Sequence, residues 1–180
     1  MIHKIILLII ASDGYQPIEY GHTRNALENA GVTVVVASDK SGMAQASNAT
    51  PKRYATAKVD VILTDVDIAQ YDGIFIIGGP GALDCLDNKT TYVIMQKAAH
   101  AKKLFGAICI SPRILAKAGV LKGKKATGWN DDNELDSVFK KAGVIYIKNP
   151  VVIDENIVTA DGPRSAALFG DTIVKLLKKT

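Results

Sequence analysis

The chain has 180 residues, a net charge of +4, 48% hydrophobic residues and two cysteines. This length supplies one well-buried core but not two, so we expect a single domain over residues 1–180, and the hydrophobic fraction excludes an intrinsically disordered chain. No apolar run approaches the roughly 20 residues of a membrane-spanning helix, and the lysines, which fall in turns and at helix ends without interleaved aromatic residues, indicate a solvated surface and not a nucleic-acid or membrane partner.

The first half of the chain alternates apolar β-branched runs with amphipathic stretches. In chain order the pattern predicts a buried strand at residues 4–11, a helix at 18–30 and a second strand at 32–38. A segment with a short hairpin at 41–60, a helical turn at 67–71 and a third strand at 73–77 follow. Pro17 near the start of the helix and Gly31 just after its end occupy the positions that these residues favour.

The second half continues the alternation. It predicts helices at residues 89–102, 112–118, 132–142 and 165–178, the third of which is ended by Gly143. Strands are predicted at 104–108 and 125–127, and a hairpin at 151–153 with 157–159. Continuous apolar strands that alternate with helices indicate an α/β fold with a parallel sheet covered on both faces. In such folds the chemistry lies at the carboxyl ends of the strands, here residues 11–19, 78–81 and 107–112.

Cys109 lies between the predicted strand 104–108 and the helix that begins near Pro112. Its neighbours two positions away, Ala107 and Ser111, are small, as a sharp strand-to-helix turn requires. The helix N-terminus would favour a thiolate through its dipole and free N–H groups. The pattern is typical of a nucleophile elbow, and by itself it also fits an inert buried cysteine.

Two further features are predicted at the same edge of the sheet. Glu19 lies in the first turn of the first helix, where the dipole stabilises a carboxylate; alone, this position is typical of the surface, but beside Cys109 the carboxyl could share a proton with the thiol. The Gly-Gly-Pro-Gly turn at residues 78–81 exposes N–H groups that could hold an oxyanion, although alone it is an ordinary turn.

The remaining cysteine and the histidines do not indicate a metal site. Two cysteines make no disulfide framework and favour a reducing, cytoplasmic compartment. A zinc site would need histidines at ligand spacing, whereas His3, His22 and His100 are scattered. Cys85 lies between acidic residues, which disfavour a thiolate, so we expect it to be the inert thiol and expect no metal or cofactor.

Taken together in order, five segments resemble the ThiJ/PfpI family. They are the acid in Gln-Pro-Ile-Glu at 16–19, the run from Tyr-Asp-Gly at 71–73 to Ile-Ile-Gly-Gly-Pro-Gly-Ala at 76–82, Ala-Ile-Cys-Ile-Ser-Pro at 107–112, Ala-Gly-Val-Leu-Lys-Gly-Lys at 118–124 and Thr-Ala-Asp-Gly-Pro at 159–163. No single motif is decisive, but the ordered set is specific. The resemblance covers nearly the whole chain, from residue 4 to about residue 177.

The resemblance implies a flavodoxin-like three-layer sandwich, related to class I glutamine amidotransferases, with a mostly parallel sheet and helices on both faces. It implies that Cys109 is hydrogen-bonded to a protonated Glu19, and that the N–H groups of Gly79 and Ile110 form an oxyanion site. Homodimers or higher oligomers are usual in the family. Its activities include glyoxalase or deglycase action on reactive carbonyls, peptidase action, chaperone action and oxidation sensing.

The sequence departs from the family where a general base is expected. Many members have a histidine directly after the cysteine, where this chain has Ile110, and others have one about seventeen residues later, where it has Trp129 and Asp131 nearby. His22, one helical turn after Glu19, is a further candidate if it leans toward the site, although its position favours a role on the surface. In one branch of the family an acid after the glycine turn reaches a neighbouring subunit's site, and Asp84 is the nearest match.

Three hypotheses follow. The first is a stress protein whose Cys109 acts on small electrophiles such as α-dicarbonyls or their adducts, with weak turnover because the usual histidine is missing. The second is an oxidation sensor in which Cys109 is oxidised to a sulfinate that Glu19 stabilises, without turnover. The third is a non-catalytic, chaperone-like oligomer.

Overall fold

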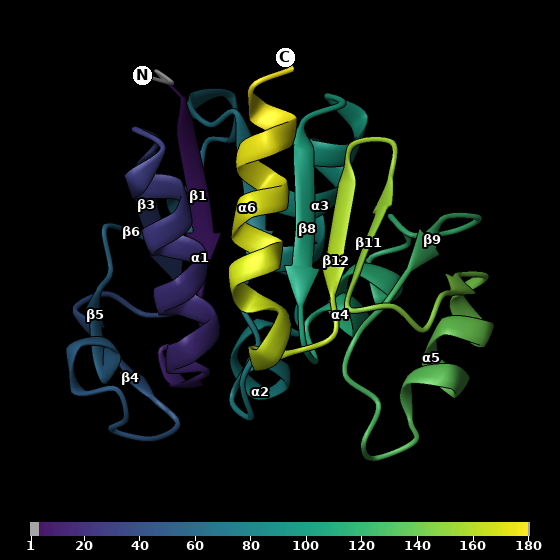
Figure 1. Cartoon of the computed structure of the whole chain (residues 1–180), viewed down its shortest axis with the longest axis horizontal. Helices are drawn as coiled ribbons and strands as arrows, with labels where there is room; N and C mark the ends of the chain where they lie inside the picture. Colours follow the sequence, from purple (N-terminus) through teal and green to yellow (C-terminus); the bar gives the residue numbers. More distant parts are fainter. Residues whose placement is uncertain (1–3, 180) are drawn as a thin grey trace.

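A seven-stranded sheet forms the centre of the computed structural model, which describes residues 4–179, and its strand order is β11-β12-β8-β7-β1-β3-β6 (Figure 1). The strands are β1 (Ile5–Ile9), β3 (Thr33–Ser38), β6 (Val61–Ile62), β7 (Gly73–Ile76), β8 (Leu104–Ile108), β11 (Val151–Asp154) and β12 (Ile157–Ala160). All neighbouring strands pair in parallel except β11 and β12, which are antiparallel. The predicted mostly parallel α/β sheet is therefore confirmed.

The central strands are apolar along their whole length because both faces of the sheet are covered. Every residue of β7 and β8 is buried, and so are Ile6–Ile9 of β1. In the register, Ile9 of β1 faces Ile76 of β7, which in turn faces Ala107 of β8. The three strands thus end level with one another, and the segments that follow them meet at one edge of the sheet.

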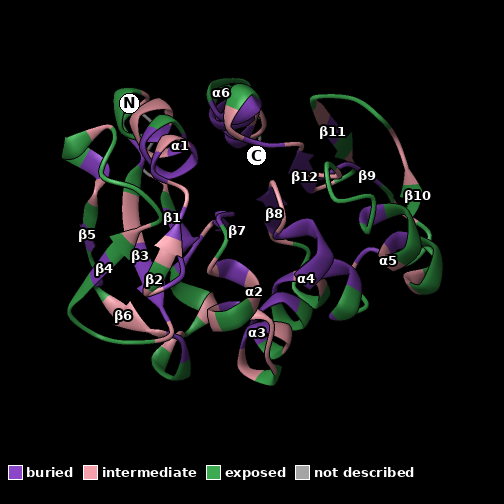
Figure 2. Cartoon of the chain, turned by 90° about the horizontal axis from the view of Figure 1, so that it is seen from below, coloured by how far each residue is buried: buried purple, intermediate pink, exposed green. Residues whose placement is uncertain are grey.

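Helices cover both faces of this sheet. They are α1 (Pro17–Asn29), α2 (Ala82–Leu86), α3 (Lys89–His100), α4 (Pro112–Lys117), α5 (Leu135–Ala142) and α6 (Ala166–Leu177). Figure 2 shows α1 and α6 on one face and α3 and α4 on the other, with α5 beyond α4. Short 3₁₀ turns occur at Lys52–Tyr54, Leu63–Asp65, Ile68–Gln70 and Pro163–Ser165. Within residues 4–179 there is no helix with the length and apolar character needed to cross a membrane.

Two small sheets flank the main one. In the first, β4 (Met43–Ala46) pairs with β5 (Thr56–Lys58) as the hairpin predicted within residues 41–60, and β2 (Asp13–Tyr15) adds to its edge. In the second, β9 (Lys125–Ala126) pairs with β10 (Ile145–Tyr146). The short strand predicted at 125–127 corresponds to β9, whereas β2, β6 and β10 are not predicted.

The largest error in a predicted boundary is three residues. The helix expected over residues 132–142 begins at Leu135. Asn133 adopts a left-handed backbone with φ of 60°, which a helix cannot continue through. The carboxylate of Asp132 accepts from the Glu134 N–H at 3.1 Å and also pairs with Arg113 of α4, so these residues form a turn before α5.

Candidate active site

Cys109 occupies the sharp turn between β8 and α4, with φ of 66°. A left-handed backbone costs a non-glycine residue roughly 1–3 kcal/mol, so neighbouring contacts must hold it. The Cys109 N–H donates to the carbonyl of Ala160 at 2.9 Å, and the hydroxyl of the buried Ser111 donates to the carbonyl of Ile77 at 2.9 Å. These bonds fix the turn to β12 and to the end of β7. This is the geometry of a nucleophile elbow.

Glu19, in the first turn of α1, is completely buried. Its Oε2 accepts a hydrogen bond from the Gly78 N–H at 2.9 Å, whereas Oε1 has no partner of hydrogen-bonding geometry among the described residues. Burial raises the pKa of Glu19 to about 8, because an ionised carboxylate loses its hydration there; contacts with the Cys109 thiol and the Gly78 N–H lower it only in part. The carboxyl is therefore mostly protonated at neutral pH.

The Cys109 thiol is partly buried and interacts with Glu19 and with the N–H groups of Ile110 and Gly79. Burial raises the pKa of the thiol, and so does the negative charge of an ionised Glu19; the two N–H groups lower this pKa only in part, so it stays above its usual range. While Glu19 holds its proton, its charge is absent and its O–H can donate to the sulfur. Glu19 and Cys109 therefore titrate as a pair, and the neutral carboxyl favours the thiolate.

The segment after β1, the turn after β7 and the elbow after β8 approach closely because glycines follow β7. Gly79 has a φ of 122°, and a side chain there would place its Cβ 2.4 Å from the carbonyl oxygen of Gly14. The Gln16 N–H donates to the carbonyl of Gly78 at 2.9 Å, and the Gln16 side chain caps α1 by accepting from the Ile18 N–H at 2.7 Å. Gln16 was not predicted as a site residue, although its place directly before a helix-starting proline indicates a cap.

A cleft of about 250 Å³ opens in front of the Cys109 thiol. Its lining residues are Gln16, Gly79, Pro80, Cys109, Ile110, Trp129 and Pro163. Trp129 forms one wall, and its backbone N–H donates to the carbonyl of Cys109 at 2.7 Å. The cleft is large enough for a small carbonyl compound and places it beside the N–H groups of Gly79 and Ile110.

Arg113 fixes the position of Trp129 through a hydrogen bond and a contact with its indole ring. Its guanidinium is almost fully buried and binds both carboxylate oxygens of Asp132, at 2.9 and 2.5 Å. It also donates to the carbonyl of Trp129 at 3.2 Å, and its Cζ lies 5.6 Å from the centre of that indole. The hydrogen bonds from Arg113 hold the pKa of Asp132 below its usual range. Sequence reasoning missed this clamp, because an arginine in the first turn of a helix resembles a surface residue.

The other predicted candidates lie away from the thiol. His22 is exposed on α1 and Asp84 is exposed on α2, and neither lines the cleft. Asp131 is exposed and accepts from the Trp129 indole N–H at 3.2 Å. His100 is exposed at the end of α3, and His3 lies outside the described residues. Within residues 4–179, then, no histidine lines the cleft and no group of three acidic, histidine or cysteine side chains could hold a metal ion.

The open parallel sheet and the turn that carries Cys109 define an α/β protein with a cysteine at the nucleophile-elbow position. Comparison with known proteins makes the assignment specific. The chain belongs to the DJ-1/PfpI family, whose model matches residues 4–176. The family identified from the ordered motifs is thereby confirmed.

Relatives match the chain over nearly its whole length. An uncharacterized protein of Methanocaldococcus jannaschii is 34% identical over 177 residues, which cover 97% of this chain and 82% of that protein. A deglycase of Thermococcus kodakarensis is 31% identical over 175 residues, covering 96% and 99%. Among solved structures, a ThiJ/PfpI domain protein of Brachyspira murdochii has a TM-score of 0.90 at 25% identity, covering 99% of this chain and 98% of that one. DJ-1beta of Drosophila melanogaster has a TM-score of 0.81 at 25% identity, covering 99% and 92%.

The environments of the two cysteines predict different reactivity. Cys109 has two N–H groups and the neutral Glu19 carboxyl near its sulfur, whereas Cys85 has the hydroxyl of Ser12 at 4.0 Å and the carbonyl of Asp13 at 3.8 Å. We expect iodoacetamide near pH 6, where Glu19 is protonated, to label Cys109 first, as mapped by peptide mass spectrometry. Earlier labelling of Cys85 would show that burial of the Cys109 thiol outweighs its neighbours.

Proposed function

We propose that this protein uses the Cys109 thiol to attack the carbonyl group of small reactive electrophiles, such as α-dicarbonyls or their adducts with amines. One observation carries the proposal: the thiol contacts Glu19, whose pKa is raised to about 8, together with the N–H groups of Gly79 and Ile110. A nucleophile, a proton carrier and two oxyanion donors are the groups that addition to a carbonyl needs.

In the first step the sulfur forms a bond to the carbonyl carbon, and the carbonyl π electrons move onto oxygen. The N–H groups of Gly79 and Ile110 then hold the oxyanion. Because its pKa is close to neutral, Glu19 exists in both protonation states and can take the thiol proton and return it to the oxygen. The product is a hemithioacetal.

A dicarbonyl can then rearrange on the enzyme. Glu19 carries a proton from the carbon bonded to sulfur to the neighbouring carbon, which converts the adduct into a thioester. Water hydrolyses the thioester to a hydroxy acid and restores the thiol. Overall one dicarbonyl and one water give one hydroxy acid, so no external oxidant or reductant is consumed.

The relatives support the same class of reaction. The Thermococcus kodakarensis protein is named a deglycase, as is a Pyrococcus furiosus relative that is 30% identical over 175 residues. The chain lacks a histidine at the cleft within residues 4–179. A positioned acid or base typically contributes on the order of 10²–10⁴-fold, so we expect turnover to be weak.

The missing histidine also favours a second candidate, an oxidation sensor in a stress response. A Cys109 thiolate would reduce one peroxide to water as it becomes a sulfenic acid, and a second peroxide would give the sulfinic acid. The protonated Glu19 carboxyl would donate a hydrogen bond to the sulfinate. Both cysteines are free thiols, which fits the reducing, cytoplasmic compartment that we propose.

Two measurements on one set of proteins separate these functions. We expect methylglyoxal consumption by the wild type and by Cys85→Ser, and none by Cys109→Ser. Mass spectrometry after mild peroxide should find the gain of two oxygen atoms on Cys109 if the protein is a sensor. Consumption that survives in Cys109→Ser would overturn the catalytic proposal, and neither activity nor oxidation would leave the chaperone-like oligomer as the alternative.

We also propose that the chain forms a homodimer or a higher oligomer. Family membership supports this, and Asp84 is exposed on α2, where it could reach a neighbouring copy. Light scattering at micromolar concentration should give at least twice the chain mass of 19.2 kDa. A mass of one chain would contradict the proposal.

A further inference from the structure

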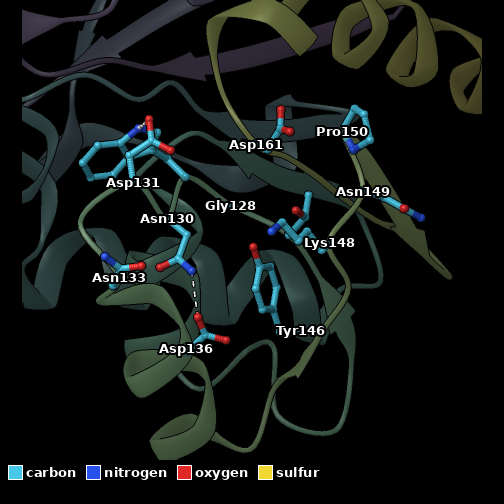
Figure 3. Close-up of a pocket in the computed structure, with 12 residues that line it drawn as sticks. Gly128, Asn130, Asp131, Asn133, Asp136, Tyr146, Lys148, Asn149, Pro150 and Asp161 are labelled. Atoms are coloured by element: carbon cyan, nitrogen blue, oxygen red, sulfur yellow. Dashed lines mark hydrogen bonds between the residues drawn. The ribbon is translucent and has the colours of Figure 1, made fainter.

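A second, larger cavity of about 580 Å³ is lined by Trp129 together with residues such as Asn130, Tyr146 and Asp161, which Figure 3 labels. The two cavities share the Trp129 wall, because Trp129 lines both of them. They share a second segment, since Asp161 lines the larger cavity and Pro163, two residues later, lines the smaller cleft. The two cavities are therefore adjacent.

The wall between the cavities is firmly attached to the elbow. Gly128 lines the larger cavity, and a Cβ added to it would lie 3.1 Å from the carbonyl oxygen of Cys109. The Trp129 N–H donates to that same carbonyl at 2.7 Å, and Arg113 binds the carbonyl of Trp129. A ligand in the larger cavity would thus contact the segment that forms the wall of the Cys109 cleft.

The larger cavity is rich in carboxylates that lack cationic partners. Asp131 accepts from the Trp129 indole, Asp136 accepts from the Asn130 amide at 2.7 Å, and Asp161 accepts from the Ser165 hydroxyl. Each of these donors is neutral, and no lysine or arginine among residues 4–179 forms an ion pair with any of the three. Their negative charges remain available to a ligand.

Other side chains of the cavity point inward as well. Figure 3 shows the Tyr146 hydroxyl directed into the cavity, with Asn130 on one side and Lys148 on the other. Burial raises the pKa of Tyr146, and the negative charges of Asp136 and Asp161 add to this, so both carboxylates act on the same space. Among residues 4–179, Lys148 is the one cationic residue that lines the cavity, which leaves three carboxylates against one ammonium group.

The arrangement discriminates between kinds of cation. Within residues 4–179 the carboxylates are not gathered closely enough to hold a metal ion. Separated carboxylates, a phenol hydroxyl and an indole instead suit an organic cation, whose several N–H donors spread over more than one acceptor and whose charge is attracted to aromatic faces.

We propose that this cavity is a subsite for a positively charged group, an ammonium or guanidinium, carried by the electrophile that reacts at Cys109. The inference rests on the proposed function for its substrate, since it assigns the remote end of the compound whose carbonyl Cys109 attacks. It makes Asp136 and Asp161 specificity-determining residues that favour cationic electrophiles over neutral or anionic ones.

Direct binding tests the subsite without any reaction. Trp129 is the one tryptophan in the chain, so its fluorescence reports on the wall of the cavity. We expect n-butylguanidinium to change this fluorescence saturably and about threefold to tenfold more tightly than n-butanol or butyrate at low salt, with the preference lost near 1 M salt. Tighter binding of butyrate, or of a neutral polyol such as sorbitol, would overturn the proposal.

The variants locate the effect. Asp136→Asn with Asp161→Asn should abolish the preference, whereas Asp65→Asn with Asp171→Asn, which removes the same charge from exposed positions elsewhere, should keep it. Lys148→Met should strengthen binding of n-butylguanidinium. An equal loss in the two double variants would show that the preference comes from overall charge and not from this cavity.

Alkylation then separates the subsite from the proposed function. In a Cys85→Ser background, iodoacetamides with tails of graded length that end in ammonium or methyl react as the thiolate displaces iodide. Faster reaction of an ammonium tail at one length, reduced in the Asp136 and Asp161 double variant, supports the proposal; no dependence on the tail argues against it. If even plain iodoacetamide fails to label Cys109, the proposed function fails, and the fluorescence titration still decides whether the cation subsite exists.

Discussion

Glu19→Gln should abolish methylglyoxal consumption and should gain stability relative to the wild type as the pH rises from about 5 to about 8. Glutamine keeps the size of the side chain, and its amide oxygen can still accept from the Gly78 N–H. It cannot take up or release a proton. Because the Glu19 carboxyl is the titratable group in contact with the Cys109 thiol, its loss removes the proton carrier of the proposed reaction.

The direction of the stability change follows from the raised pKa. In the unfolded chain a glutamate has a pKa of about 4.3, whereas burial raises the pKa of Glu19 in the folded protein to about 8. Between these values the folded state binds more protons than the unfolded state, so wild-type stability contributed by this group falls as pH rises. Glutamine does not titrate, so the variant does not undergo the decrease of about 4 kcal/mol in the free energy of unfolding that the wild type shows by pH 8.

Urea unfolding of both proteins at several pH values measures this difference. The amide N–H₂ group of the glutamine can donate one hydrogen to the Cys109 sulfur, but its second hydrogen lacks a partner, which lowers the stability of the variant by a similar amount at every pH. The prediction therefore concerns the slope of the difference with pH. Glu28→Gln, at an exposed position on the same helix, is the control and should not reproduce the slope. A difference that stays flat from pH 5 to pH 8 would mean that Glu19 is already ionised in the folded protein.

The fold could be predicted because its main strands leave a local pattern. The apolar runs of β1, β7 and β8 each end in a segment with polar or small residues, and parallel pairing brings such ends to one edge. The sequence pattern therefore predicts that Glu19, Gly79 and Cys109 lie at a common edge of the sheet, and the fold brings them into contact.

The rest of the site depends on contacts between distant residues, which local patterns do not reveal. Full burial of Glu19 arises because the Gly78 turn and the elbow close over the first turn of α1, where a carboxylate is ordinarily solvated. The Arg113 clamp joins residues nineteen positions apart through a turn that interrupts the predicted helix. The cation subsite combines the segment after β9 with the residues after β12, so no single stretch of sequence contains it.

Gly78→Ala should destabilise the fold and slow the alkylation of Cys109. A Cβ at this position would lie 2.6 Å from the Cβ of Cys109, 2.7 Å from Oε2 of Glu19 and 2.9 Å from the carbonyl oxygen of Ile108. Separations below 3.0 Å are not tolerated, and two of these atoms belong to the elbow itself, so the added methyl group cannot be accommodated by rotating a flexible side chain. Overpacking of this kind typically costs about 1–3 kcal/mol.

The methyl group would also act on the proposed chemistry, because it enters the space between the Glu19 carboxyl and the Cys109 side chain. Either the Glu19 carboxyl gives up its bond with the Gly78 N–H, or the Cys109 sulfur moves away from the N–H groups of Gly79 and Ile110. Urea unfolding and iodoacetamide kinetics should therefore both change. Gly42→Ala is the control: with φ of 95° and no atom within 4 Å of its added Cβ, it should cost backbone strain alone and leave Cys109 reactivity intact. Unchanged alkylation in a stable Gly78→Ala protein would show that the reactivity of Cys109 does not depend on its contact with Glu19, since glycine at the end of β7 is what lets these side chains meet.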